Sequence, residues 1–296
     1  MSELRKYPRP KKVEIVYFSG TGGTKRAADS FISEFTKQGI SVHCHEIHAR
    51  NPYKLQEYDL LLILYPVYAM NAPRPVYDFI NKLPIADKKL AAVISVSGGG
   101  EVIPNTASRL HCIQHLKKRG YRIAYEQMLI MPANCIIPTP KELSLMLLKV
   151  LPDKVNRIVT DLLSGVVRRT EPYLIDRIIS VFAEAQKEGS KLYGKNIRTS
   201  LACNGCGLCA RGCPTSNIKL QGGKPVYASR CCLCLRCIYS CPRKALKPAF
   251  VRRFILKGGF SLKELEKELP AFQPIDVIHY PYDTGFAGLK EYFLAQ

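Results

Sequence analysis

The sequence predicts an α/β protein with a doubly wound, parallel, five-stranded sheet, followed by a small α+β domain. Three observations support this fold class. Apolar runs of strand length alternate with amphipathic helical patterns through residues 13–131. A turn rich in glycine and hydroxyl groups, at residues 19–24, joins the first apolar run to the first helix. Residues 203–242 carry two copies of the cysteine pattern C-x2-C-x2-C-x3-C-P.

The chain divides into four segments. We expect a basic N-terminal tail at residues 1–12, the sheet domain with a helical bridge at 13–192, the cysteine-rich domain at 193–249 and a C-terminal extension at 250–296. A chain of 296 residues is long enough for two domains with cores of their own. It has no apolar run of about 18 residues, so we expect no transmembrane segment. The N-terminus lacks the apolar stretch of a signal peptide, which predicts a cytoplasmic location.

The elements of the sheet domain follow from the period of their apolar residues. We expect strands at residues 13–18, 41–47, 58–65, 90–96 and 121–131, and helices at residues 25–37, 76–82 and 105–118. Their alternation predicts the strand order 2-1-3-4-5, with a ligand at the carboxyl ends of the strands. Beyond the sheet we expect helices at 141–151, 153–167 and 173–193, a hairpin at 217–227 and a late helix capped by Ser261.

The turn after the first strand is a candidate phosphate-binding loop, made of Ser19, Gly20, Thr21, Gly22, Gly23 and Thr24. Its backbone N–H groups, its hydroxyl groups and the start of the following helix all favour an anion. It lacks the Lys-Ser/Thr ending of a P-loop, and Lys25 stands where a dinucleotide fingerprint needs its third glycine. The form S/T-x-T-G-x-T resembles the FMN-phosphate loop of flavodoxins. A plain glycine-rich turn is the alternative.

Two further loops should lie at the same edge of the sheet and hold the flavin ring. One follows the third strand at residues 65–71, and the other follows the fourth strand at residues 97–100. An aromatic side chain can stack on the ring, and glycines let the backbone approach the ring's edge. The candidate ring contacts are Tyr68, Asn71, Ser97, Gly98, Gly99 and Gly100. Tyr68 also fits a plain surface aromatic residue.

The cysteines form two identical motifs, one of Cys203, Cys206, Cys209 and Cys213, the other of Cys231, Cys234, Cys237 and Cys241. This is the spacing of bacterial ferredoxins with two [4Fe-4S] clusters, in which the cysteine before the proline binds the other cluster. We therefore expect cluster I to take the first three cysteines of the first motif with Cys241. Cluster II should take the first three cysteines of the second motif with Cys213.

Two other interpretations of the cysteines explain less of the pattern. A zinc ribbon needs four ligands and would leave half of the motif cysteines and both Cys-Pro pairs without a role. A disulfide framework needs an oxidising compartment, which the N-terminus does not indicate. Cys232 lies within the second motif but does not fit its spacing, so it either binds no cluster or serves as a replacement ligand.

The charge is strongly basic, with 44 Lys and Arg against 24 Asp and Glu and a formal net charge of +20. Between Glu188 and Glu264 there is no acidic residue, whereas fifteen Lys and Arg fall in that interval. This excess predicts a docking face for an acidic redox protein, either a ferredoxin-type donor or a reductase acceptor. No nucleic acid is expected as partner, because no basic motif with interleaved aromatic residues occurs.

With both halves in view, residues 13–249 resemble the fused flavodoxin–ferredoxin proteins, found mainly in anaerobic bacteria and archaea. The resemblance rests on Y-F-S-G-T-G-G-T-K-R-A, Y-P-V-Y-A-M-N-A-P, M-P-A-N, N-I-K-L-Q-G-G-K-P and both cysteine motifs. It implies a flavodoxin-like domain with FMN and a bacterial-type ferredoxin domain with two [4Fe-4S] clusters.

No nicotinamide fingerprint and no nucleophile–base constellation occurs in the sequence. We therefore predict an electron-transfer flavo-iron-sulfur protein that links a low-potential one-electron donor to a redox partner. The alternatives are an FMN-dependent reductase of a small molecule, supplied by its own clusters, and a redox or oxygen sensor.

Overall fold

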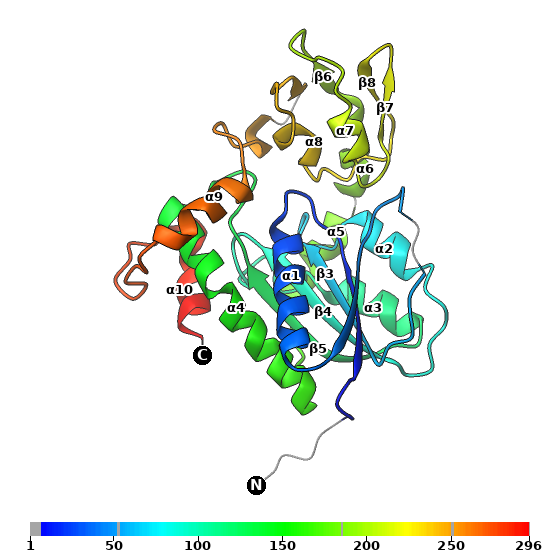
Figure 1. The fold of residues 1–296 in the computed structure, drawn as a ribbon, viewed down its shortest axis with the longest axis vertical. Coiled ribbons are helices and arrows are strands. Elements are labelled where there is room, and N and C mark those ends of the chain that lie inside the picture. Colours follow the sequence, from blue (N-terminus) through cyan, green and yellow to red (C-terminus); the bar gives the residue numbers. More distant parts are fainter. Residues whose placement is uncertain (1–6, 52–53, 185, 250–251, 296) are drawn as a thin grey trace.

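The computed structural model describes residues 7–51, 54–184, 186–249 and 252–295. A sheet with helices on both faces forms the larger part, the cysteine-rich segment lies beyond one end of the sheet, and the C-terminal helices lie beside the longest helix (Figure 1). In the described part of the chain, no helix combines the length and the apolar character that crossing a bilayer requires.

The sheet consists of five parallel strands in the predicted order. They are β1 (Lys12–Tyr17), β2 (Ser41–Glu46), β3 (Leu60–Pro66), β4 (Leu90–Ser97) and β5 (Arg122–Ile130), arranged β2-β1-β3-β4-β5. The middle strand, β3, is buried from Leu60 to Tyr65, because helices cover both faces of the sheet.

Two apolar cores lie on the two faces of the sheet. Helices α1 (Gly23–Lys37) and α4 (Lys141–Ser164) cover one face, and α2 (Arg74–Ile80) and α3 (Leu110–Lys118) cover the other. Successive residues of β1 alternate between the cores: Ile15 belongs to the α1/α4 side and Val16 to the α2/α3 side. The sheet domain is therefore held by apolar burial on both faces.

Several predicted boundaries are wrong. Two helices were expected, one before and one after Pro152, but α4 continues through this proline. Leu148 before it and Val155 after it are both buried, so packing compensates for the hydrogen bond that a proline cannot donate. The single helix expected at 173–193 is two, α5 (Leu174–Ala183) and α6 (Gln186–Lys195). Residues 7–12 are not a free tail, because Tyr7 is buried and its hydroxyl donates to the Val166 carbonyl at 3.2 Å. Residues 1–6 lie outside the described part.

The cysteine-rich part contains short elements only: β6 (Ile197–Thr199), α7 (Leu208–Arg211), β7 (Ile218–Gln221), β8 (Lys224–Tyr227), α8 (Arg236–Tyr239) and β9 (Leu246–Pro248). The predicted hairpin is confirmed, with β7 and β8 antiparallel. Strands β6 and β9 form a second antiparallel pair that brings the two ends of this part together.

The C-terminal extension packs on the sheet domain. It contains η1 (Arg252–Phe254), α9 (Leu262–Glu268), η2 (Leu269–Ala271), η3 (Thr284–Phe286) and α10 (Ala287–Leu294). The predicted cap of α9 is confirmed, since the Ser261 hydroxyl accepts from the Glu264 amide at 3.3 Å. Leu262 joins the core under α1 and α4, and Leu289 packs with Ile130 and Leu143.

Candidate functional site

A cavity of about 580 Å³ opens at the carboxyl ends of the strands. The loops after β1, β3, β4 and β5 form most of its wall, as expected for a doubly wound sheet. The remaining wall includes residues 232–235 of the cysteine-rich part, Ala183 at the end of α5, and Phe260 and Phe286 of the C-terminal extension. Its volume lies in the usual range for cofactor sites, about 300–1,000 Å³.

The predicted phosphate loop lies at one end of this cavity. Helix α1 begins at Gly23, two residues earlier than expected, after Gly22 in a left-handed conformation with φ 109°. The N-cap residue, Gly22, has no side chain to occupy the first amides of the helix, where an anion is favoured. The Ser19 hydroxyl accepts from the amides of Gly22 at 3.2 Å and Lys25 at 3.4 Å, which fixes the turn. Gly23 and Thr24 line the cavity, and the loop therefore fits a terminal phosphate.

The loop after β3 places Tyr68 and Asn71 beside the phosphate loop. The Tyr68 ring lies edge-on to Phe18 with centroids 6.3 Å apart, and desolvation of its buried hydroxyl raises its pKa well above the ordinary value. The Asn71 amide nitrogen donates to the Ser180 carbonyl at 2.7 Å. Among the described residues, neither the Tyr68 hydroxyl nor the Asn71 Oδ1 has a hydrogen-bond partner. Both residues line the cavity, but these two polar atoms have no surface open to it, so they offer a cofactor no hydrogen bond in this arrangement.

The glycines of the two flavin loops have different roles. A Cβ on Gly98 would lie 2.7 Å from the Ala133 Cβ, whereas a Cβ on Gly99 would meet open space. Gly22 and Gly100 were predicted to contact the cofactor, but neither lines the cavity. Both have positive φ, and their Cβ positions face Leu262 and Ile130 instead. They are needed for the turns themselves, behind the wall.

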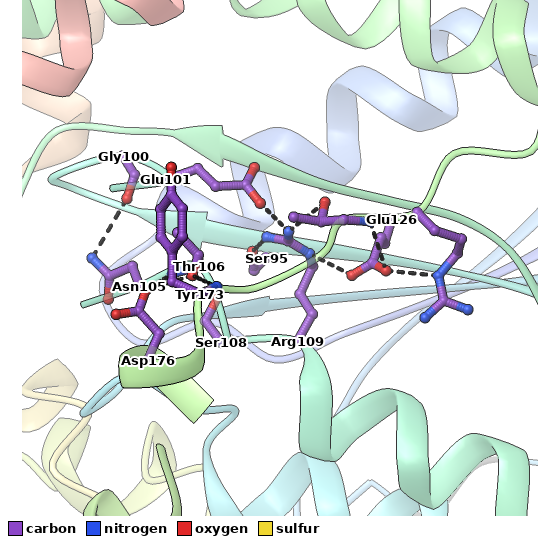
Figure 2. A network of polar contacts seen from close by, with 12 residues as sticks. Ser95, Gly100, Glu101, Asn105, Thr106, Ser108, Arg109, Glu126, Tyr173 and Asp176 are labelled. Atoms are coloured by element: carbon purple, nitrogen blue, oxygen red, sulfur yellow. Dashed lines mark hydrogen bonds and ion pairs between the residues drawn. The ribbon is translucent and has the colours of Figure 1, made fainter. Parts of the chain in front are cut away.

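The loop behind these glycines is held by a buried polar network (Figure 2). Arg109 is 1% exposed and donates to Glu126 and to Ser95 at 3.0 Å each, with Glu101 as a further ion-pair partner. Asp176 of α5 accepts from the backbone amide of Thr106 at 3.0 Å. These contacts fix residues 101–109 as turns, which explains why α3 begins at Leu110 rather than at residue 105. No sequence pattern indicates this network, because its members lie far apart in the chain.

The eight motif cysteines line two small cavities in the crossed grouping. One is lined by Cys203, Cys206, Cys209 and Cys241, and the other by Cys213, Cys231, Cys234 and Cys237, with Cys232 beside them. All of these cysteines are free thiols. Backbone amides donate to the sulfurs of Cys213 at 3.2 Å, Cys231 at 3.4 Å and Cys241 at 3.3 Å. Such N–H donors stabilise thiolates and the sulfur atoms of clusters.

The thiols do not converge on one point. In the described part of the chain, no group of three or more His, Cys, Asp or Glu side chains is placed to hold a single metal ion. A zinc ion needs four ligands within about 2.3 Å of it. Cysteines that each bind a different iron of a cluster stand further apart. The ligand roles of the eight cysteines stay a prediction.

Residues 232–235 line both the large cavity and the second cysteine cavity. Cys232 is buried in the core on the α2/α3 side of the sheet, so it is part of the contact between the two halves. Its hydrogen bond to Cys234 lowers the pKa of the Cys234 thiol to about 7. One stretch of chain therefore separates the two candidate cofactor sites.

Arg236 ties this stretch to the phosphate loop. Its guanidinium donates to the carbonyls of Gly20 at 2.9 Å, Ser19 at 2.5 Å and Gly212 at 3.2 Å, and it forms an ion pair with Glu46. The Arg236 side chain is 20% exposed, so this residue is not part of a basic docking face as its position in the acid-free interval suggested. Nothing in the sequence pattern distinguishes it from the other arginines of that interval.

Comparisons with known proteins give one family match and several solved structures of low similarity. Residues 14–110 match the family model described as a flavodoxin domain. No curated protein matches the sequence. Similar solved structures include an archaeal flavodoxin (14% identity, 51% of this chain and 98% of that chain, TM-score 0.36) and flavodoxin 2 from Bacillus cereus (17%, 51% and 97%, 0.37). Another is an NAD(P)H:quinone oxidoreductase from Methanothermobacter marburgensis (11%, 53% and 100%, 0.40).

The assignment of the fold rests on the family match over residues 14–110 and on the observed strand order, with the cavity at the carboxyl ends of the strands. The five-stranded sheet and its flanking helices therefore fit the flavodoxin-like fold.

Proposed function

We propose that this chain is an electron-transfer protein with FMN in the large cavity and two [4Fe-4S] clusters in the crossed cysteine sets. The observation that carries the proposal is the shared wall at residues 232–235, which faces both the large cavity and one cysteine cavity. When bound, such clusters exchange one electron at a time and FMN exchanges one or two, so together they link one-electron donors to flavin chemistry.

The chain's own residues hold and separate the two sites. The first amides of α1 and the hydroxyls of the phosphate loop would bind the FMN phosphate, and the loop at 97–100 would orient the ring. Arg236 fixes the distance between the phosphate loop and the second cysteine motif. Phe260 and Phe286 of the extension add apolar side chains to the wall of the cavity.

The proposed redox partner is an acidic protein that docks on the cysteine-rich part. Exposed side chains there include Arg211, Lys219, Lys224, Arg243 and Lys247. Opposite charge would speed association through long-range attraction, so the bimolecular electron-transfer rate with an acidic ferredoxin should fall steeply as ionic strength rises. A rate that does not depend on salt would remove this part of the proposal.

Cofactor content is the first test. After anaerobic reconstitution, iron, sulfide and flavin assays should give about eight irons, about eight sulfides and about one FMN per chain. One zinc and no iron would overturn the proposal.

Crossed ligation is tested by Cys213→Ala. This substitution in the first motif should remove the cluster formed mainly by the second motif, and electron paramagnetic resonance of the reduced protein should show the other cluster intact. Cys112→Ala, at a buried thiol outside the motifs, is the matched control and should keep both signals. Loss of the cluster of the first motif by Cys213→Ala would contradict the crossing.

The last test separates a carrier from a reductase. The holoprotein is reduced anaerobically with a low-potential donor, and reoxidation of the flavin is followed by absorbance. Rapid reoxidation by a protein acceptor, with no small molecule consumed, supports the carrier. Saturable turnover of one metabolite would establish a reductase instead.

A further inference from the structure

Helix α5 buries two polar side chains and exposes most of its apolar ones. Its buried side chains are Asp176 and Ser180. Its outward side carries Leu174, Ile175, Ile178, Val181 and Phe182, and Leu174 and Phe182 are 73% and 75% exposed. These five residues form one continuous stripe at helical spacing. A surface helix normally has the opposite arrangement, so this apolar face indicates a binding surface.

The inward contacts fix this orientation of α5. The Asp176 carboxylate accepts hydrogen bonds from the amide and the hydroxyl of Thr106, as Figure 2 shows. The Ser180 carbonyl accepts from the Asn71 side chain at 2.7 Å. Rotating the helix to bury its apolar stripe would break these bonds and leave a buried carbonyl and a carboxylate without donors, which is costly. The stripe therefore faces outward as a consequence of specific contacts.

We propose that the outward face of α5 is a peripheral membrane-binding surface that inserts into the headgroup boundary of an anionic lipid bilayer. Aliphatic and aromatic side chains in one stripe are what such a boundary accepts. The charge of the chain is complementary to anionic lipid, with a net charge of +20. Arg177 on α5, Arg168 before it and Lys195 after it are exposed cations in the same stretch of chain.

A second copy of this chain fits the face less well. A stable dimer buries about 800 Å² and about 20–30 residues on each side, whereas α5 offers a stripe of five apolar residues. Two copies would also each bring a net charge of +20. A protein partner normally adds about one hydrogen bond per 100–200 Å², and the stripe has no side chain that can form one. A bilayer requires neither area nor hydrogen bonds of this kind.

Docking through α5 would bring the large cavity close to the lipid surface. Ala183, the last residue of α5, lines that cavity. Ile136 and Ile137 also line it and are 59% and 54% exposed, so the apolar character continues at its rim. The binding surface itself does not depend on which cofactor the cavity holds.

Vesicle flotation with the full-length chain tests the proposal. The chain should float with vesicles of phosphatidylglycerol and phosphatidylcholine, and much less with phosphatidylcholine alone. Leu174→Gln with Phe182→Gln should lower the partition coefficient on the order of a hundredfold, because two large apolar side chains no longer insert. Arg177→Gln should lower it about fivefold. Ile85→Gln, at an exposed apolar residue before β4, is the matched control and should bind like the wild type.

Three results would overturn the proposal: no flotation of the wild type with anionic vesicles, equal flotation of the double variant, or a dimer in light scattering that the double variant dissociates. The dimer would identify a second copy as the occupant. Circular dichroism checks that the variants are folded, and Phe182→Gln alone replaces the double variant if that variant is not.

Discussion

The two halves of the molecule differ in what holds them together. The flavodoxin-like half has two extended apolar cores in which residues such as Ile15, Leu62 and Val93 are fully buried. The cysteine-rich half has strands of three or four residues, and its apolar clusters are small and contain the motif cysteines themselves. A segment of this size seldom folds on apolar burial alone. We therefore expect the proposed clusters to supply much of the stability of the second half.

The largest expected effect is therefore that of iron removal. Chelation under reducing conditions should unfold the cysteine-rich half and leave the sheet folded, because ligand binding supplies most of the folding free energy of such a segment. In hydrogen exchange followed by mass spectrometry, peptides across β7 and β8 should lose protection on the order of a thousandfold. Peptides across β3 should keep theirs.

Removal of flavin is the matched control for this experiment. It should leave the protection of β7 and β8 unchanged, since the hairpin does not line the large cavity. A chelated protein that keeps full protection in the hairpin would show that the two halves are held in the same way.

The same contrast governs what the sequence can predict. The apolar residues of β1 and β3 follow one another in the sequence, so a local pattern reveals that both strands are buried. The five strands and their order in the sheet were therefore predicted correctly. Cysteine spacing led to the crossed grouping that the two small cavities show. The roles of the turn glycines were harder to predict. Gly22 and Gly100 have positive φ and do not line the cavity, so their place in a motif reflects the path of the backbone.

Contacts between distant segments could not be predicted. Arg236 and Ser19 are far apart in the chain, and only the fold brings them together. The outward face of α5 depends on Asp176 meeting Thr106, which no local pattern indicates. Pro152 predicted a break, yet burial on both sides of it overrides the local preference. In each case tertiary structure decides the outcome.

The next effect tests the connection between the halves. Arg236→Gln removes the ion pair with Glu46 and weakens three hydrogen bonds to backbone carbonyls, including those of the phosphate loop. Since the pair is partly exposed, we expect a loss of about 2 kcal/mol in unfolding free energy. FMN affinity should fall about tenfold, because the loss of charged hydrogen bonds leaves the loop less ordered. Titration by flavin fluorescence measures the affinity.

Arg198→Gln is the matched control for Arg236, because this exposed arginine lies in the same half and lines neither cysteine cavity. It should change neither stability nor flavin affinity. An Arg236→Gln protein that binds FMN like the wild type would mean that the phosphate loop is ordered by the sheet domain alone.

A smaller effect is expected within the sheet domain, at two adjacent glycines. Gly98→Ala places a methyl group 2.7 Å from the Ala133 Cβ and should cost about 1–3 kcal/mol in unfolding free energy. Gly99→Ala meets open space and should change stability by less than about 0.5 kcal/mol. Urea unfolding followed by circular dichroism measures both. Equal losses in the two variants would mean that backbone freedom, and not the close approach to Ala133, makes glycine necessary here.

The smallest effect concerns which half the C-terminal extension stabilises. Ser261→Ala removes the cap of α9 and should lower the unfolding free energy by about 1 kcal/mol, because the Glu264 amide loses its acceptor. Ser261→Asp should restore most of the lost unfolding free energy, because aspartate also caps helices. Ser229→Ala is the matched control, since this exposed serine lies in the cysteine-rich half. Since Leu262 packs in the core of the sheet domain and lies behind Gly22, the loss should appear as reduced exchange protection in α1 and α4. Reduced protection in β7 and β8 instead would show that the extension stabilises the cysteine-rich half, and would join the two halves into one cooperative unit.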